Sequence, residues 1–132
     1  MNITHEERVA RELASRVPYP VACICGSMQF HDWMLKVAER YTLNGHIVLM
    51  PFVRKDSALS LSERNFRHES EQKLPDGVNL PIFLDSMHRA KIDMSDLVVV
   101  CTNAEHYIGS STRDEILYAT KRGKTVVVEA AS

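Results

Sequence analysis

Hydroxyl and acidic residues gather near the C-terminal end of the chain, between Gly109 and Glu115. Gly109 is followed by three hydroxyl residues, Ser110, Ser111 and Thr112. At the start of a helix, such a run offers backbone N–H groups, O–H donors and the positive end of the helix dipole, which together suit a phosphate. Plain helix capping is the alternative, because Ser111 with Asp114 and Thr112 with Glu115 both have capping-box spacing.

Glu115 is the residue of this run that could perform covalent chemistry. We expect it in the first helical turn, where the dipole and nearby N–H groups keep a carboxylate ionised. An ionised carboxylate beside a sugar can attack the anomeric carbon, giving a covalent intermediate that water or a second acceptor then takes. Glu115 is therefore a candidate nucleophile for glycosyl transfer, with the capping box as its structural alternative.

A second candidate group lies on the helix expected over residues 82–94. His88 and Lys91 share one face of this helix, and Asp85 lies one turn before His88. Because the pKa of histidine is near neutrality, His88 could protonate a departing base. A solvated helix surface with an Asp85–Arg89 ion pair is the alternative.

Gly26 and Ser27 form another candidate anion site, directly after an apolar run. Glycine lets a ligand approach the backbone, and the next helix presents free N–H groups, although a glycine here can also serve only the turn. Within the run, Cys23 and Cys25 are predicted to be buried strand residues rather than a disulfide or a zinc pair. Since dinucleotide, P-loop and metalloprotease motifs are absent from the sequence, we expect no cofactor and no metal.

The elements that must position these residues alternate between strand and helix. Four apolar, β-branched runs predict the strands: Val21–Cys25, His46–Met50, Asp96–Thr102 and Thr125–Glu129. Helical spacing of apolar residues predicts helices over 30–43, 82–94 and 112–122. This order implies right-handed crossovers and an α/β three-layer sandwich with a parallel sheet of four or five strands. Ligands bind such sheets at the carboxyl ends of the strands, where the candidate residues fall.

Residues 1–132 are predicted to form one domain with two additions. A capping box at Thr4 and Glu7 opens an extra N-terminal helix within residues 1–17. Residues 54–81 interrupt the alternation, and this insertion is either a lid, whose Arg64 and Arg67 could reach an anion, or a passive surface excursion.

Composition excludes several classes of function. With 45% hydrophobic residues, 25% charged residues and a net charge of −1, the chain is typical of a globular protein without the basic excess that binds polymeric nucleic acid or an anionic membrane. The sequence has no secretory signal pattern and no apolar run of the ~20 residues that a membrane span needs. We therefore expect a cytoplasmic protein with a small-molecule ligand.

The motifs as a set resemble the nucleoside 2-deoxyribosyltransferase-like family, which includes 2′-deoxynucleoside 5′-monophosphate N-glycosidases. The resemblance rests on Cys25-Gly-Ser27, Gly45-His-Ile-Val, His88-x-x-Lys-Ile-Asp-x-x-Asp96-Leu-Val-Val-Val, Tyr107-Ile-Gly109 and Glu115-Ile-x-x-Ala119. It covers nearly the whole chain apart from the first helix and the insertion. It implies a flavodoxin-like fold, a nucleoside or nucleoside 5′-monophosphate as substrate, and a homo-oligomer, dimer or higher.

The same resemblance assigns roles to residues. It implies that Glu115 is the nucleophile and that the small residues of two loops hold the 5′-phosphate, namely Gly26, Ser27, Gly109, Ser110 and Ser111. The sequence departs from the family at three places. A tyrosine of the family falls at Cys23, its helix aspartate aligns with His88 while Asp85 lies a turn away, and hydroxyl residues replace glycines before Glu115.

A second resemblance leaves both ribose and deoxyribose as the possible sugar of the substrate. Thr112-x-x-Glu115 is similar to the G-T-x-x-E element of cytokinin-activating phosphoribohydrolases, which implies a role for Thr112 in substrate binding. Both families break an N-glycosidic bond, but one acts on ribose and the other on deoxyribose. The alternative to an enzyme is a non-catalytic nucleotide-sensing module on the same fold, because function lies in the site rather than in the fold.

Overall fold

A four-stranded parallel sheet forms the centre of the fold. The computed structural model describes residues 2–15, 18–52 and 79–132. The strands are β1 (Val21–Gly26), β2 (Ile47–Leu49), β3 (Leu97–Thr102) and β4 (Thr125–Ala130), in the order β2-β1-β3-β4. Each of the three neighbouring pairs is parallel. This order confirms the predicted flavodoxin-like sheet, whose topological switch point lies between β1 and β3.

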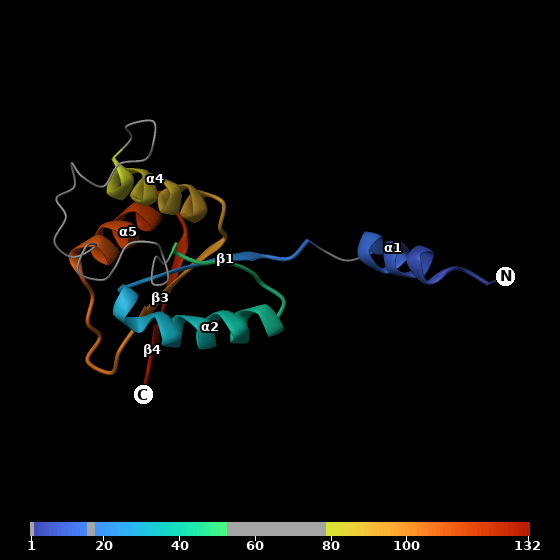
Figure 1. Ribbon diagram of the computed structural model, residues 1–132, viewed down its shortest axis with the longest axis horizontal. Coiled ribbons are helices and arrows are strands. Elements are labelled where there is room, and N and C mark those ends of the chain that lie inside the picture. Colours follow the sequence, from blue (N-terminus) through green and yellow to red (C-terminus); the bar gives the residue numbers. More distant parts are fainter. Residues whose placement is uncertain (1, 16–17, 53–78) are drawn as a thin grey trace.

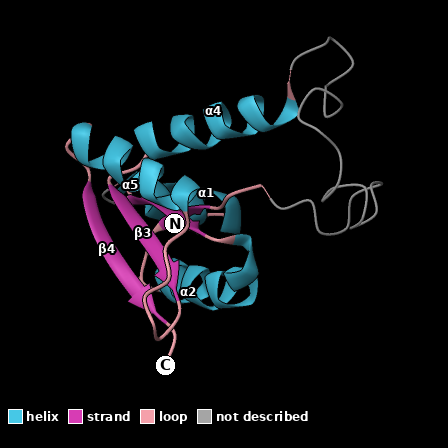
Figure 2. Ribbon diagram, turned by 90° about the vertical axis from the view of Figure 1, so that its left-hand side faces the viewer, coloured by secondary structure: helices cyan, strands magenta, loops and turns pink. Residues whose placement is uncertain are grey.

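Helices cover both faces of the sheet. α2 (His31–Leu43), which follows the short 3₁₀ helix η1 (Met28–Phe30), lies on one face. α4 (Leu80–Asp93) and α5 (Ser110–Lys121) lie together on the other face (Figure 1, Figure 2). The predicted three-layer sandwich is thereby confirmed. α4 and α5 carry most of the candidate chemistry, so the site belongs to their face.

Each face of the sheet has its own apolar cluster. The cluster under α2 contains the buried residues Ala22, Ile24, Met34, Val37, Val99 and Cys101. The cluster under α4 and α5 contains Cys23, Cys25, Ile92, Val98, Val100 and Ala119. The alternation of β1 side chains between the two faces explains why odd and even residues of this strand enter different clusters. Cys23 and Cys25 are fully buried and free, as predicted for core strand residues.

Two helix starts differ from the prediction. α4 begins at Leu80 because the Asn79 side chain accepts a hydrogen bond from the Ile82 N–H, which caps the helix. α5 begins at Ser110 with Gly109 as its N-cap, two residues before the predicted start. The two predicted capping boxes are therefore wrong, since their first residues already lie inside the helix rather than at the cap.

The N-terminal helix, α1 (His5–Ser15), opens with the predicted capping box. Thr4 Oγ1 accepts from the Glu7 N–H at 3.0 Å, and a Glu7 carboxylate oxygen accepts from the Thr4 N–H at 3.3 Å. Most of the predicted insertion, with Arg64 and Arg67, lies outside the described residues; of its last three residues, Asn79 caps α4, and Leu80 and Pro81 begin it. No helix among the described residues is long and apolar enough to span a membrane.

Candidate functional site

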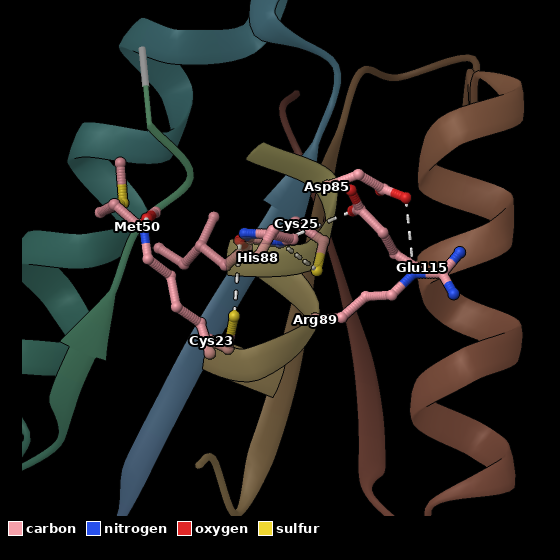
Figure 3. A network of polar contacts seen from close by, with 9 residues as sticks. Cys23, Cys25, Met50, Asp85, His88, Arg89 and Glu115 are labelled. Atoms are coloured by element: carbon pink, nitrogen blue, oxygen red, sulfur yellow. Dashed lines mark hydrogen bonds and ion pairs between the residues drawn. The ribbon is translucent and has the colours of Figure 1, made fainter. Parts of the chain in front are cut away.

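Three elements bring Cys25, His88 and Glu115 together at the carboxyl end of the sheet. Cys25 lies near the end of β1, His88 on α4 and Glu115 on α5 (Figure 3). His88 Nε2 is 3.3 Å from Cys25 Sγ and 3.7 Å from a Glu115 carboxylate oxygen. The side chains of His88 and Glu115 are only 8% and 13% exposed. Two of the three predicted catalytic residues thus meet at the edge where an α/β sheet binds its ligand.

A cleft of about 230 Å³ opens over the side chains of His88 and Glu115. It is lined by Met28, Pro51, Phe52, Pro81, Leu84, Asp85, Met87, His88, Lys91, Ser111 and Glu115. A second hollow, next to it, is lined by Pro81, Ile82, Asp85, Ser110, Ser111 and Asp114. Pro81, Asp85 and Ser111 line both, so all three predicted catalytic residues and two predicted phosphate ligands, Ser110 and Ser111, share one continuous hollow surface. Its apolar walls with a few polar groups are typical of a small-molecule site.

Burial changes the ionisation of Glu115. The structure raises the pKa of this carboxyl group to about 7, mainly because burial disfavours the charged form. A hydrogen bond from Cys25 acts in the opposite direction but does not offset the burial. The prediction that the helix dipole keeps Glu115 ionised is therefore wrong. α5 starts at Ser110, so Glu115 lies in the second turn, where the effect of the dipole has already declined.

His88 is neutral at physiological pH. Burial lowers its pKa to about 4, and the nearby Lys91 ammonium acts in the same direction. The expectation that the pKa of His88 lies near neutrality is wrong for this environment, because burial disfavours the charged imidazole. Among the described residues, the His88 Nδ1 atom is buried without a hydrogen-bond partner. A neutral ring with one unpaired nitrogen is better suited to position Glu115 than to donate a proton.

Cys25 belongs to the site although the sequence indicated only a core residue. Its hydrogen bond with Cys23 and its burial raise the pKa of the Cys25 thiol, so the group is a neutral thiol at physiological pH. Period-two alternation along β1 was the available signal, since it places Cys25 on the face that α4 and α5 cover.

Lys91 and Asp85 bring opposite charges to the cleft. Lys91 Nζ donates a hydrogen bond to the Met50 carbonyl at 2.7 Å, which joins α4 to the end of β2. Asp85 pairs with Arg89 at 3.6 Å across one helical turn, so the ion pair proposed as its structural alternative is present. Both residues nevertheless line the cleft, as expected for the shared face of α4.

The first predicted phosphate loop has a packing role. Gly26 has a φ of +154°, and a Cβ there would lie 2.6 Å from the Cys101 carbonyl oxygen and 2.8 Å from the end of the Met34 side chain. The backbone conformation and the packing against Cys101 and Met34 therefore require glycine at this position, whether or not a ligand binds. Ser27 is the N-cap of η1, and its side chain makes no capping hydrogen bond. Neither residue lines the two hollows, whereas the next residue, Met28, lines the cleft over His88.

The second predicted phosphate loop divides into two kinds of residue. Ser110 and Ser111 are exposed and line the hollow surface, so they are accessible to a ligand. Thr112 is buried at 4% exposure, and Gly109 is an N-cap in extended conformation; neither lines the two hollows. The region is joined to the β1 loop by an edge-to-face contact between Phe30 and Tyr107.

Comparison with known proteins supports the fold. No family model and no curated protein matches the chain. Among solved structures, the 2-desoxiribosyltransferase from Leishmania mexicana is similar, with a TM-score of 0.54 at 13% sequence identity over 86% of this chain. The chain spans 65% of the length of that protein. At this identity the likeness shows a shared flavodoxin-like three-layer fold, and the resemblance to phosphoribohydrolases gains no support from it.

Proposed function

We propose that the protein cleaves, or transfers at, the N-glycosidic bond of a nucleoside or nucleoside 5′-monophosphate, with Glu115 as nucleophile. The observation that carries the proposal is the convergence of Glu115, His88 and Asp85 on one small cleft at the carboxyl end of the sheet. The similar fold of a 2-desoxiribosyltransferase supports the same class of reaction. A carboxyl group with a pKa raised to about 7, lining a cleft, is typical of functional sites.

The chemistry proceeds in two steps. In the first, an ionised Glu115 oxygen bonds to the anomeric carbon, the bond from that carbon to the base nitrogen breaks, and its electron pair leaves with the base. Because His88 is neutral, the proton that the departing base takes up comes from solvent water in this proposal, and the Asp85 carboxylate, which lines the cleft, relays it. In the second step, water or another base attacks the anomeric carbon and releases Glu115.

His88 acts as a positioning residue in this scheme. Its Nε2 atom lies between the Cys25 sulfur and the Glu115 carboxylate, so the ring restricts the carboxylate to the side of α5 that faces the cleft. Such restriction reduces the freedom that the nucleophile must lose before attack.

The test is a panel of nucleosides and 5′-monophosphates, with ribose or deoxyribose, and chromatography for free base. The proposal expects base release from at least one member of the panel. A 2′-fluoro nucleoside should trap the covalent intermediate, because fluorine disfavours the oxocarbenium-like transition state, and mass spectrometry should find the sugar on the peptide with Glu115. Tight binding without base release would overturn the enzyme assignment and favour the nucleotide-sensing module.

A further inference from the structure

Two cysteines and one histidine form a compact group beneath the cleft. Ligand atoms of Cys23, Cys25 and His88 all lie within 4.8 Å of one another. The two cysteines are neighbours on one face of β1, since they are two residues apart, and His88 reaches them from α4 (Figure 3). All three residues are buried. The group could not be predicted from the sequence, because His88 lies 63 positions after Cys25 in the chain.

The donor set is chemically selective. Thiolate sulfur favours soft cations, and imidazole suits zinc, copper and related ions, whereas magnesium and calcium prefer oxygen. Two thiolates neutralise a divalent cation, so the filled group would carry no net charge. This matters because an uncompensated charge is very unfavourable in a buried position.

We propose that Cys23, Cys25 and His88 bind one thiophilic divalent cation of the zinc and cadmium class. Binding releases the protons of both thiols to solvent and forms two metal–sulfur bonds and one metal–nitrogen bond. Three protein ligands leave one position of a tetrahedral shell. The carboxylate of Glu115, 3.7 Å from His88 Nε2, is close enough to approach that position.

The surroundings of the group support this assignment. His88 Nε2 is 3.3 Å from Cys25 Sγ, so a nitrogen and a sulfur donor already lie close together. The cleft provides access from the side of His88, because His88 and Glu115 both line it. The inference concerns binding alone and does not depend on the proposed glycosidic reaction.

The test is a cadmium titration of the reduced, full-length protein without an affinity tag. Thiolate-to-cadmium charge transfer gives an ultraviolet absorption that carboxylate or imidazole sites lack. The expected result is saturation at one cadmium ion per chain, with displacement by zinc. No such absorption under a several-fold excess of cadmium would overturn the proposal, whether or not any variant folds.

The third cysteine provides a matched control. Cys101 is equally buried but lies in the cluster of the opposite face. Cys25→Ser, or Cys25→Ala if the serine variant fails to fold, should weaken cadmium binding by roughly 100-fold or more, since loss of an outer-shell partner already costs 10- to 100-fold. Cys101→Ser should bind like wild type. Equal weakening by the Cys25 and Cys101 variants would overturn the proposal.

Discussion

Each face of the sheet holds a partly buried glutamate, and the two glutamates have different interaction partners. On the α2 face, Glu129 of β4 accepts a hydrogen bond from the Tyr41 hydroxyl at 3.1 Å and pairs with the Arg40 guanidinium. Its backbone carbonyl also accepts from the Trp33 indole N–H at 2.9 Å. On the opposite face, Glu115 has a neutral imidazole and a neutral thiol as its neighbours.

This difference separates a carboxylate in an ion pair from a carboxylate that lines a cleft. Glu129 has a cationic partner and a hydroxyl donor, so it fastens α2 to the edge of the sheet. Among the described residues, Glu115 forms no ion pair with a lysine or arginine, and the Arg89 guanidinium favours its charged form less than burial disfavours it. Groups whose burial is not compensated reduce stability, and proteins tolerate them mainly where function needs them.

The largest expected effect comes from Glu115→Gln. If Glu115 attacks the anomeric carbon, the neutral amide is a poor nucleophile, and base release should fall by about 1,000-fold or more while ligand binding is retained. The measurement is chromatographic base release together with calorimetric binding. Full turnover in the folded Glu115→Gln protein would rule out the nucleophile.

Glu129→Gln is the matched control for this experiment. It removes one carboxylate of the same type from the other face, where we expect base release within a few-fold of wild type. Its cost should appear in stability instead, at about 1 to 3 kcal/mol, because Arg40 and Tyr41 lose their charged partner. Similar losses of turnover in both variants would break the comparison between the two faces.

The next effect concerns stability and pH. The folded protein holds the Glu115 proton up to a pH of about 7, whereas the unfolded chain releases it near 4.5. The contribution of this group to stability is therefore complete below pH 4.5 and is lost as pH rises to 7, by about 3 kcal/mol in all. Glu115→Gln should unfold at higher urea than wild type at pH 8 and at similar urea at pH 5. An equal difference at both pH values would contradict the assigned pKa.

His88 does not obscure this measurement. Its folded pKa of about 4 lies below its ordinary value of 6.5, so it reduces stability as pH falls from 6.5 to 4 in wild type and variant alike. The difference between the two proteins isolates Glu115.

A smaller effect is expected where β1 meets the α2 face. Gly26→Ala would place a methyl group against the Cys101 carbonyl and Met34, at a φ that disfavours side chains, and should cost about 2 kcal/mol in the free energy of unfolding. Gly109→Ala is the control on the α5 side. There φ is −75° and the added Cβ meets Tyr107 at an ordinary 3.5 Å, so the loss should stay within about 1 kcal/mol. Equal urea midpoints for the two variants would count against the packing role of Gly26.

The sequence was sufficient for the fold because local patterns determine it. Continuous β-branched runs gave the four strands, and apolar spacing gave the helices between them. The carboxyl-end rule directed attention to Gly26-Ser27 and to the stretch that contains Glu115, whereas His88 and Asp85 were selected from a helix face, and in the structure Glu115, His88 and Asp85 line one cleft.

The chemistry of the site was less predictable because it depends on contacts between distant segments. Cys25 and Glu115 are 90 positions apart in the chain, and only packing of α4 and α5 on β1 shows that both touch His88. Burial then shifts the pKa values of His88 and Glu115 away from the solution values on which the sequence argument relied.

The N-cap of α5 was not predicted correctly from the sequence either. Hydroxyl residues satisfy a capping pattern at several registers, and Gly109, extended at φ −75° and ψ 170°, fixed the start.

The smallest expected effect tests whether the face of the sheet under α4 and α5 also binds a phosphate. Ser111 lies in the first turn of α5 and lines both hollows. Ser111→Asp should not destabilise the fold, since a carboxylate near a helix start is favourable, but its charge should repel a 5′-phosphate. We expect monophosphate affinity to fall about 10-fold or more in calorimetric titrations, while nucleoside affinity changes little. Ser111→Asn has nearly the same shape without the charge and should bind both ligands like wild type. Equal losses for nucleoside and monophosphate would mean that Ser111 contacts the sugar or base, and the phosphate would then belong elsewhere on the surface.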